Sequence, residues 1–163
     1  MRVYFLRHGI AEDARTWSGS DFDRALTDEG RERMEREAKA IDHLSLGLKR
    51  IITSPLLRAK QTAEIVADRL KMNDDLVEDP KLAGGFTFDR LAGMLAAQGM
   101  PESVLLVGHE PNMSVSLGRA IGSANVELKK AALAGVEFAE APPETGTLIC
   151  LIPPKVLVAL GKS

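Results

Sequence analysis

The sequence is poor in several features that would each assign a protein to a specialised class. Cysteine occurs once, at Cys150, which excludes an intrachain disulfide framework and a zinc site built from several cysteines. No apolar run approaches the roughly 18 residues that a membrane-spanning helix needs, and the apolar stretch 3–6 is too short for the core of a signal peptide. We therefore expect a cytoplasmic protein that does not insert into a membrane.

Charge balance and aromatic content narrow the class further. The 21 lysines and arginines are matched by 23 aspartates and glutamates, so the chain lacks the basic excess with which proteins bind nucleic-acid backbones. Aromatic residues make up only 4% of the chain, so we expect a core of aliphatic side chains and methionine. The 163 residues, 45% of them hydrophobic, fit a single globular domain that spans residues 1–163.

What the sequence does contain is short apolar runs that alternate with segments of helical periodicity. The apolar runs predict strands at 3–6, 50–53 and 104–107. The periodic segments predict helices over 27–44, 55–71, 88–98 and 111–121, with Thr27 and Ser54 as N-caps and Pro55 in a first helical position. Segments 10–26 and 72–87 show no clear period, and we expect the first to form a loop over a site.

The C-terminal part departs from this alternation. Segments 132–138 and 147–152 predict two strands at an antiparallel edge, separated by a loop rich in proline and glycine. The apolar tail 156–160 predicts one further short strand, and Cys150 is expected to be a small core residue. The whole pattern predicts an α/β domain whose sheet is mostly parallel.

Unusual polar residues follow each of the three predicted parallel strands. Arg7 and His8 follow the first strand, Arg58 lies one turn beyond Ser54 after the second, and His109 follows the third. Because ligands of open α/β sheets bind beyond the carboxyl ends of the strands, we expect these four side chains to converge on one crevice. Taken singly, each also fits a hydrogen-bonded turn or a solvated side chain; together they predict a site.

The residue types favour phosphate chemistry. Guanidinium groups match phosphate oxygens, helix N-termini add backbone N–H donors, and a neutral imidazole is a competent nucleophile at phosphorus. No GxxxxGK[ST] or strand-linked GxGxxG motif occurs, and isolated histidines beside arginines disfavour a metal ion. The third histidine, His43, is expected to complement the C-terminal end of a helix.

Three blocks of the chain resemble the motifs of a known family. Leu6–Gly9 (LRHG), Thr53–Ala63 (TSPLLRAKQTA) and Val107–Asn112 (VGHEPN) resemble those of the histidine phosphatase superfamily, the phosphoglycerate-mutase-like proteins. The short length and the Leu26-Thr27…Gly30 element resemble its SixA-type phosphohistidine phosphatase branch. The resemblance implies a three-layer α/β/α sandwich, no cofactor and no metal.

The resemblance also implies roles for the four converging residues. His8 would be the nucleophile that becomes phosphorylated, and Arg7, Arg58 and His109 would bind the phosphoryl group. Many members carry an acidic residue as general acid between the arginine helix and the second histidine, but here Ala83 and Gly84 occupy that region. Possible substitutes, or else solvated loop carboxylates, are Glu78, Asp79 and Glu110.

The function we expect is a metal-independent phosphatase that removes the phosphoryl group from phosphohistidine on a partner protein. A first alternative is a phosphatase for a small phosphomonoester, which a usable acid in the pocket would favour. A second alternative is a non-catalytic module that binds phosphate or a phosphoprotein. No nucleic-acid partner is expected, and the sequence specifies neither an oligomeric state nor the identity of the partner.

Overall fold

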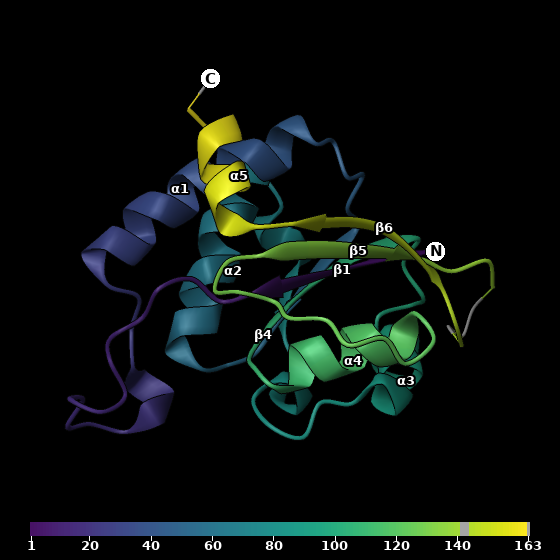
Figure 1. The fold of residues 1–163 in the computed structure, drawn as a ribbon, viewed down its shortest axis with the longest axis horizontal. Helices are drawn as coiled ribbons and strands as arrows, with labels where there is room; N and C mark the ends of the chain where they lie inside the picture. Colours follow the sequence, from purple (N-terminus) through teal and green to yellow (C-terminus); the bar gives the residue numbers. More distant parts are fainter. Residues whose placement is uncertain (141–143, 163) are drawn as a thin grey trace.

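A six-stranded sheet forms the middle layer of the computed structural model, which describes residues 1–140 and 144–162 (Figure 1). The strand order is β3-β2-β4-β1-β5-β6. The strands are β1 (Arg2–Arg7), β2 (Arg50–Thr53), β3 (Leu76–Glu78), β4 (Ser103–Gly108), β5 (Leu133–Glu137) and β6 (Thr147–Ile152). The first four strands pair in parallel and the last two antiparallel, which confirms the mostly parallel sheet with an antiparallel edge.

Helices cover both faces of the sheet (Figure 1). On one face lie α1 (Asp28–His43), α2 (Leu57–Leu70) and α5 (Pro154–Leu160), and on the other lie α3 (Phe88–Ala97) and α4 (Asn112–Ala120). Alternate residues of β1 serve the two faces: Phe5 packs on the α3 and α4 side, whereas Leu6 packs on the α1 and α2 side. The fold is therefore the expected three-layer α/β/α sandwich.

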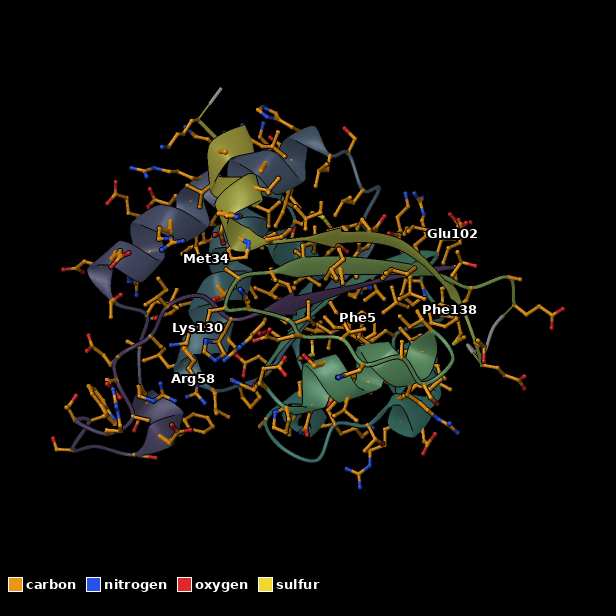
Figure 2. All side chains as sticks on the ribbon, in the orientation of Figure 1. Phe5, Met34, Arg58, Glu102, Lys130 and Phe138 are labelled. Carbon is orange, nitrogen blue, oxygen red and sulfur yellow. The ribbon has the colours of Figure 1, made fainter. Side chains whose placement is uncertain are left out.

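Local sequence signals explain the first helix. The Thr27 side chain accepts a hydrogen bond from the backbone N–H of Gly30, as expected of an N-cap residue. Met34, Ala38 and Ile41 recur at helical spacing and are fully or almost fully buried against the sheet. Side chains fill the layer on the opposite face as well, where Figure 2 labels Phe5 and Phe138.

The C-terminal tail is a helix, so the predicted strand at 156–160 is wrong. Helix α5 begins at Pro154, whose fixed φ suits the first turn of a helix, and it packs Leu157 against α1. Val156 and Leu160 remain exposed. A run of five apolar residues is too short for its periodicity to distinguish a helix from a strand.

Two further expectations need correction. Segment 72–87 is not wholly irregular, because Leu76 and Val77 pair with β2 as the short edge strand β3. Helix α2 begins at Leu57, two residues later than predicted, and the Ser54 hydroxyl accepts a hydrogen bond from Leu56 N just before the helix. Ser54 thus shapes the approach to the helix without being its N-cap.

Other features agree with expectation, differ from it or lie outside the described residues. His43 lies in the last turn of α1, as expected, whereas Cys150 is only partly buried and packs against the edge of the core on the α1 side, so it is not the core residue that was expected. Part of the predicted loop between β5 and β6, residues 141–143, lies outside the described residues. Within the described part of the chain, no helix is long and apolar enough to cross a membrane.

Candidate active site

The parallel register places the ends of three strands at the same level. Arg7 at the end of β1 is paired with Gly108 at the end of β4, and Thr53 at the end of β2 is paired with Val107. His8 N donates to Gly108 O at 3.1 Å, and Ser54 N donates to Val107 O at 3.0 Å. The residues that directly follow these strands are consequently neighbours.

One pocket, with a volume of about 430 Å³, contains all four residues predicted to form the site: Arg7, His8, Arg58 and His109. His8, Arg58 and His109 are only 6%, 5% and 9% exposed. The predicted convergence at the carboxyl ends of the strands is therefore observed.

His8 is held as a neutral imidazole with a defined tautomer. Its Nδ1 lies 2.8 Å from Gly9 O, and because a carbonyl oxygen only accepts, Nδ1 carries the proton. Burial, reinforced by His109, Arg58 and Arg7, holds the pKa of His8 well below its usual value, so the ring is neutral near pH 7. The lone pair is therefore on Nε2, the nitrogen that is able to act as a nucleophile.

The turn that carries His8 is fixed from α2. Gly9 N donates to Thr62 Oγ1 at 3.0 Å, and the same hydroxyl donates to Arg58 O at 2.7 Å. A Cβ atom at position 9 would lie 2.8 Å from Met34 Cγ, so any larger residue there would force the Met34 side chain on α1 to move. Arg58 and Thr62 are four residues apart and therefore lie on the same face of α2. Arg58 reaches into the pocket, and Thr62 supports the turn formed by His8 and Gly9.

His109 is oriented by Ser54. Its Nε2 lies 2.8 Å from Ser54 Oγ, and that hydroxyl already accepts from Leu56 N, so its own proton is available to Nε2. Burial, assisted by Arg58, lowers the pKa of His109 to about 4. Its Nδ1 has no partner in the described residues and is buried next to His8, whose ring centroid is 5.1 Å away.

Arg58 is bound by the loop that precedes α1. Its Nη1 donates to Asp21 O at 2.8 Å and its Nη2 to Asp21 Oδ2 at 3.0 Å. The other carboxylate oxygen of Asp21 accepts from Arg24 at 2.8 Å. Segment 10–26 thus lies over the site, as expected, and contributes several residues to the wall of the pocket, among them Glu12, Asp13, Arg15 and Arg24.

The pocket carries more positive than negative charge. Arg7 donates to Leu128 O at 2.9 Å, and burial lowers its pKa against the opposing effect of Glu110. Arg15, Arg24 and Lys130 also line the pocket, and the sequence analysis did not single them out. Among the described residues, five cationic side chains and three carboxylates surround the cavity, which suits a phosphoryl dianion.

Of the three candidate acids, the structure places only Glu110 in the pocket. Glu78 forms an ion pair with Lys60 at 2.8 Å, and Asp79 Oδ1 accepts from Lys81 N at 2.9 Å, so both serve local structure outside the pocket. Glu110 lines the pocket, and one of its oxygens is buried without a partner in the described residues. Glu12, which the sequence analysis did not predict, also lines the pocket.

Metal ligands do not gather at this or any other place that the structure describes. No group of three or more histidine, cysteine, aspartate or glutamate side chains in residues 1–140 and 144–162 has an arrangement able to hold a metal ion.

A protein-family comparison now assigns the class. The model of the histidine phosphatase superfamily (branch 1) matches residues 3–85, which contain Arg7, His8 and Arg58. The chain therefore belongs to the histidine phosphatase superfamily and is a hydrolase of the phosphatase type.

Individual relatives agree with this class. An uncharacterized protein of Picosynechococcus sp. is 34% identical over 172 residues, which cover 97% of this chain and 99% of that protein. Phosphohistidine phosphatase SixA of Escherichia coli is 32% identical over 114 residues, 68% of each chain. A solved structure of the protein histidine phosphatase SixA complexed with tungstate superposes with a TM-score of 0.83 at 26% identity, over 95% of this chain and 98% of that chain.

Proposed function

We propose that this chain is a metal-independent phosphohistidine phosphatase that acts on a partner protein through a covalent phospho-His8 intermediate. The observation that carries the proposal is the state of His8: it is buried and neutral, and Gly9 O holds its Nδ1 proton, in a pocket rich in positive charge. Such an imidazole presents the Nε2 lone pair to phosphorus and needs no base to remove a proton.

In the first step, His8 Nε2 attacks the phosphorus atom in line with the P–N bond of the substrate. A new P–N bond forms on Nε2, the substrate's P–N bond breaks, and the departing imidazole nitrogen takes up a proton from solvent water. The guanidinium groups of Arg7 and Arg58 neutralise charge on the equatorial oxygens, and the neutral His109 donates its Nδ1–H to one of them. One P–N bond replaces a similar one, so the step is close to thermoneutral.

In the second step, water attacks phospho-His8. A P–O bond forms, the P–N bond to Nε2 breaks with its electron pair returning to Nε2, and one proton of the attacking water is released to solvent, so that inorganic phosphate and neutral His8 result. Gly9 O keeps its hydrogen bond to Nδ1 throughout both steps, which fixes the ring for attack from one direction.

The nature of the leaving group favours phosphohistidine as substrate. Imidazole has an unperturbed pKa near ~6.5 and leaves once protonated, whereas an alkoxide needs a positioned acid that contributes about 10²–10⁴-fold. Glu78 and Asp79 are engaged outside the pocket, and Ala83 and Gly84 carry no acid. The likeness to SixA proteins described as phosphohistidine phosphatases supports the same choice.

A second candidate function is hydrolysis of a small phosphomonoester. It is favoured by Glu110, whose carboxyl group lines the pocket and has one buried oxygen without a partner in the described part of the chain. A carboxyl group in that position would be able to protonate an alkoxide. Under this reading, Glu110→Gln should abolish turnover of the phosphomonoester.

A substrate panel separates the two functions. We expect kcat/KM to be highest for a phosphohistidine peptide, lower for an aryl phosphate and lowest for a sugar phosphate, in the presence of a chelator. Glu110→Gln should change phosphohistidine turnover by less than about tenfold, below the usual contribution of a general acid. A sugar phosphate that outperforms the peptide and depends on Glu110 would replace the proposal by the second function. A substrate of the phosphorelay type would also place the enzyme in the cytoplasm.

A further inference from the structure

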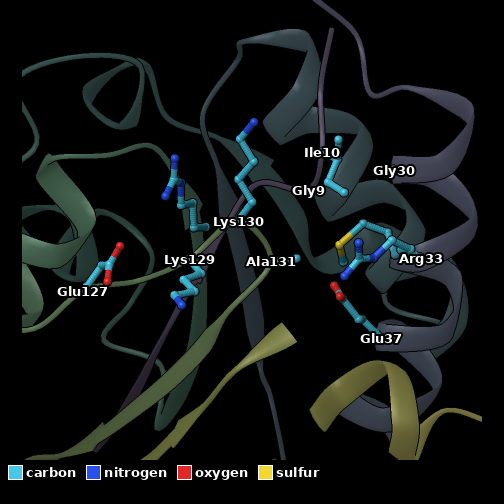
Figure 3. Close-up of a pocket in the computed structure, with 11 residues that line it drawn as sticks. Gly9, Ile10, Gly30, Arg33, Glu37, Glu127, Lys129, Lys130 and Ala131 are labelled. Atoms are coloured by element: carbon cyan, nitrogen blue, oxygen red, sulfur yellow. The ribbon is translucent and has the colours of Figure 1, made fainter. Parts of the chain in front are cut away.

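A second cavity, of about 400 Å³, lies next to the catalytic pocket (Figure 3). The two cavities share Arg7 and Lys130 in their linings. The second is otherwise bounded by residues 9–10, by residues 30–37 of α1 and by segment 127–131. Apart from Gly9, the proposed reaction makes no use of these residues.

The wall of this cavity contains a buried carboxyl group without a partner. Glu37 on α1 is 0% exposed, and neither of its side-chain oxygens has a hydrogen-bond partner in the described residues. Figure 3 shows the Glu37 carboxyl group beside the Arg33 guanidinium at the cavity. Burial raises the pKa of Glu37 to about 8 against the opposing effect of Arg33, so near pH 7 the group is a neutral acid that is able to donate a hydrogen bond.

Positive charge lines the cavity. The cavity is lined by the cations Arg7, Arg33, Lys129 and Lys130 and by one other carboxylate, Glu127. Helix α5, which packs on α1, has the sequence PKVLVAL and adds no acidic group. These four cationic side chains would repel a cationic ligand and attract an anion.

The remaining lining is apolar or backbone and includes Ile10, Met34 and Ala131. We propose that this cavity binds a small organic carboxylate, with its charged group at Arg33, Lys129 and Glu37 and its apolar body against Met34. An O–H group that donates to a carboxylate makes a short, strong hydrogen bond, so Glu37 adds affinity only while it is protonated. This site is additional to the proposed phosphatase reaction and does not depend on it.

Met34 provides a readout that is confined to this cavity. It lines the second cavity but not the catalytic pocket, so the ¹³C-labelled methyl group of Met34, assigned with Met34→Leu, reports occupancy without any turnover. Benzoate is the probe. We expect a saturable shift of the Met34 signal near pH 7 and no shift of Met94, which is buried on the opposite face of the sheet.

The pH dependence distinguishes Glu37 from simple attraction by the cations. Because Glu37 loses its proton around pH 8, benzoate affinity should fall about tenfold between about pH 7 and about pH 9. In Glu37→Gln, which keeps a neutral donor, this fall should disappear. Lys129→Ala should weaken binding several-fold, while the exposed α1 variants Glu35→Gln and Lys39→Ala should bind as the wild type does.

Several results would overturn the proposal. The absence of saturation up to about 50 mM benzoate would mean that no specific site exists. An equal loss in Lys39→Ala and Lys129→Ala would show diffuse attraction only. If Glu37→Gln unfolds, the exposed Lys129 still tests the site, and an unchanged affinity in Lys129→Ala would contradict the proposal.

Discussion

The guanidinium of Arg58 is held by Asp21, a residue 37 positions earlier in the chain, through hydrogen bonds of 2.8 and 3.0 Å. The phosphoryl group of the proposed substrate would use the same two nitrogen atoms. Asp21 is therefore both a positioning residue for Arg58 and a competitor of phosphate. The loop that covers the site thus affects its anion affinity.

Removing the charge of Asp21 should strengthen phosphate binding. Asp21→Asn keeps a side-chain oxygen near Arg58 but removes the negative charge, so the dissociation constant of phosphate should fall several-fold, as measured by calorimetry. Asp23→Asn, in the same 3₁₀ turn, is the matched control and should leave it unchanged. Weaker phosphate binding in Asp21→Asn would show that orienting Arg58 is the more important effect.

Substitutions of Arg58 should separate charge from geometry. Arg58→Ala should lower kcat/KM by roughly 10²–10³, the usual effect of losing a preorganised electrostatic contact. Arg58→Lys keeps the charge but lacks the planar fork, so its loss should be smaller yet clear. Equal activity of the two variants in steady-state kinetics would contradict a bidentate role, and near-normal kinetics of Arg58→Ala would place the side chain outside the reaction.

Ser54 and Ser116 offer a matched pair of buried hydroxyls. Ser54→Ala leaves His109 Nε2 without its partner, so unfolding free energy should fall by about 1–3 kcal/mol and kcat should fall about tenfold. Ser116 Oγ is buried without a partner in the described residues, so Ser116→Ala should be neutral or stabilising. Chemical denaturation and phosphatase assays of both variants test this; a larger loss in Ser116→Ala would contradict it.

The lowered pKa of His109 predicts a specific dependence of stability on pH. The unfolded chain protonates this histidine near pH ~6.5, whereas the folded chain does so only near pH 4, so stability is lost as pH falls between these values. For His109 the loss is about 3 kcal/mol over the window. His109→Gln should remove this loss of stability on acidification. Glu37, whose pKa is raised, makes the folded state more stable as pH falls, and this opposite effect remains in both the wild type and the variant. An identical pH profile of the two proteins in urea denaturation would contradict the assignment.

Strand ends were the part of the site that the sequence predicted well. Apolar runs followed by Arg7-His8, Ser54-Pro55 and His109 place polar groups where parallel strands end, and the parallel register makes those ends neighbours. These signals are local, because each strand and its following residues are adjacent in the chain. The helices over 28–43 and 88–97 were predictable for the same reason.

Contacts between distant segments could not be predicted in this way. The bonds of Asp21 with Arg58 and of Ser54 with His109 join residues 37 and 55 positions apart, and no periodicity specifies them. Glu37 lies among Met34, Ala38 and Ile41 on a stripe that predicts burial, but a glutamate there was not expected to be buried without a partner. The three residues of β3 were too few to show a period.

The central claim is that His8 carries the phosphoryl group, and a trapping experiment tests it most directly. Turnover of a ³²P-labelled phosphohistidine peptide should be quenched, and the protein should then be digested and sequenced by mass spectrometry. We predict an acid-labile, base-stable label on the peptide that contains His8, absent from His8→Ala, which should also lack turnover. Wild-type turnover in His8→Ala, or a label found on another residue, would contradict the mechanism.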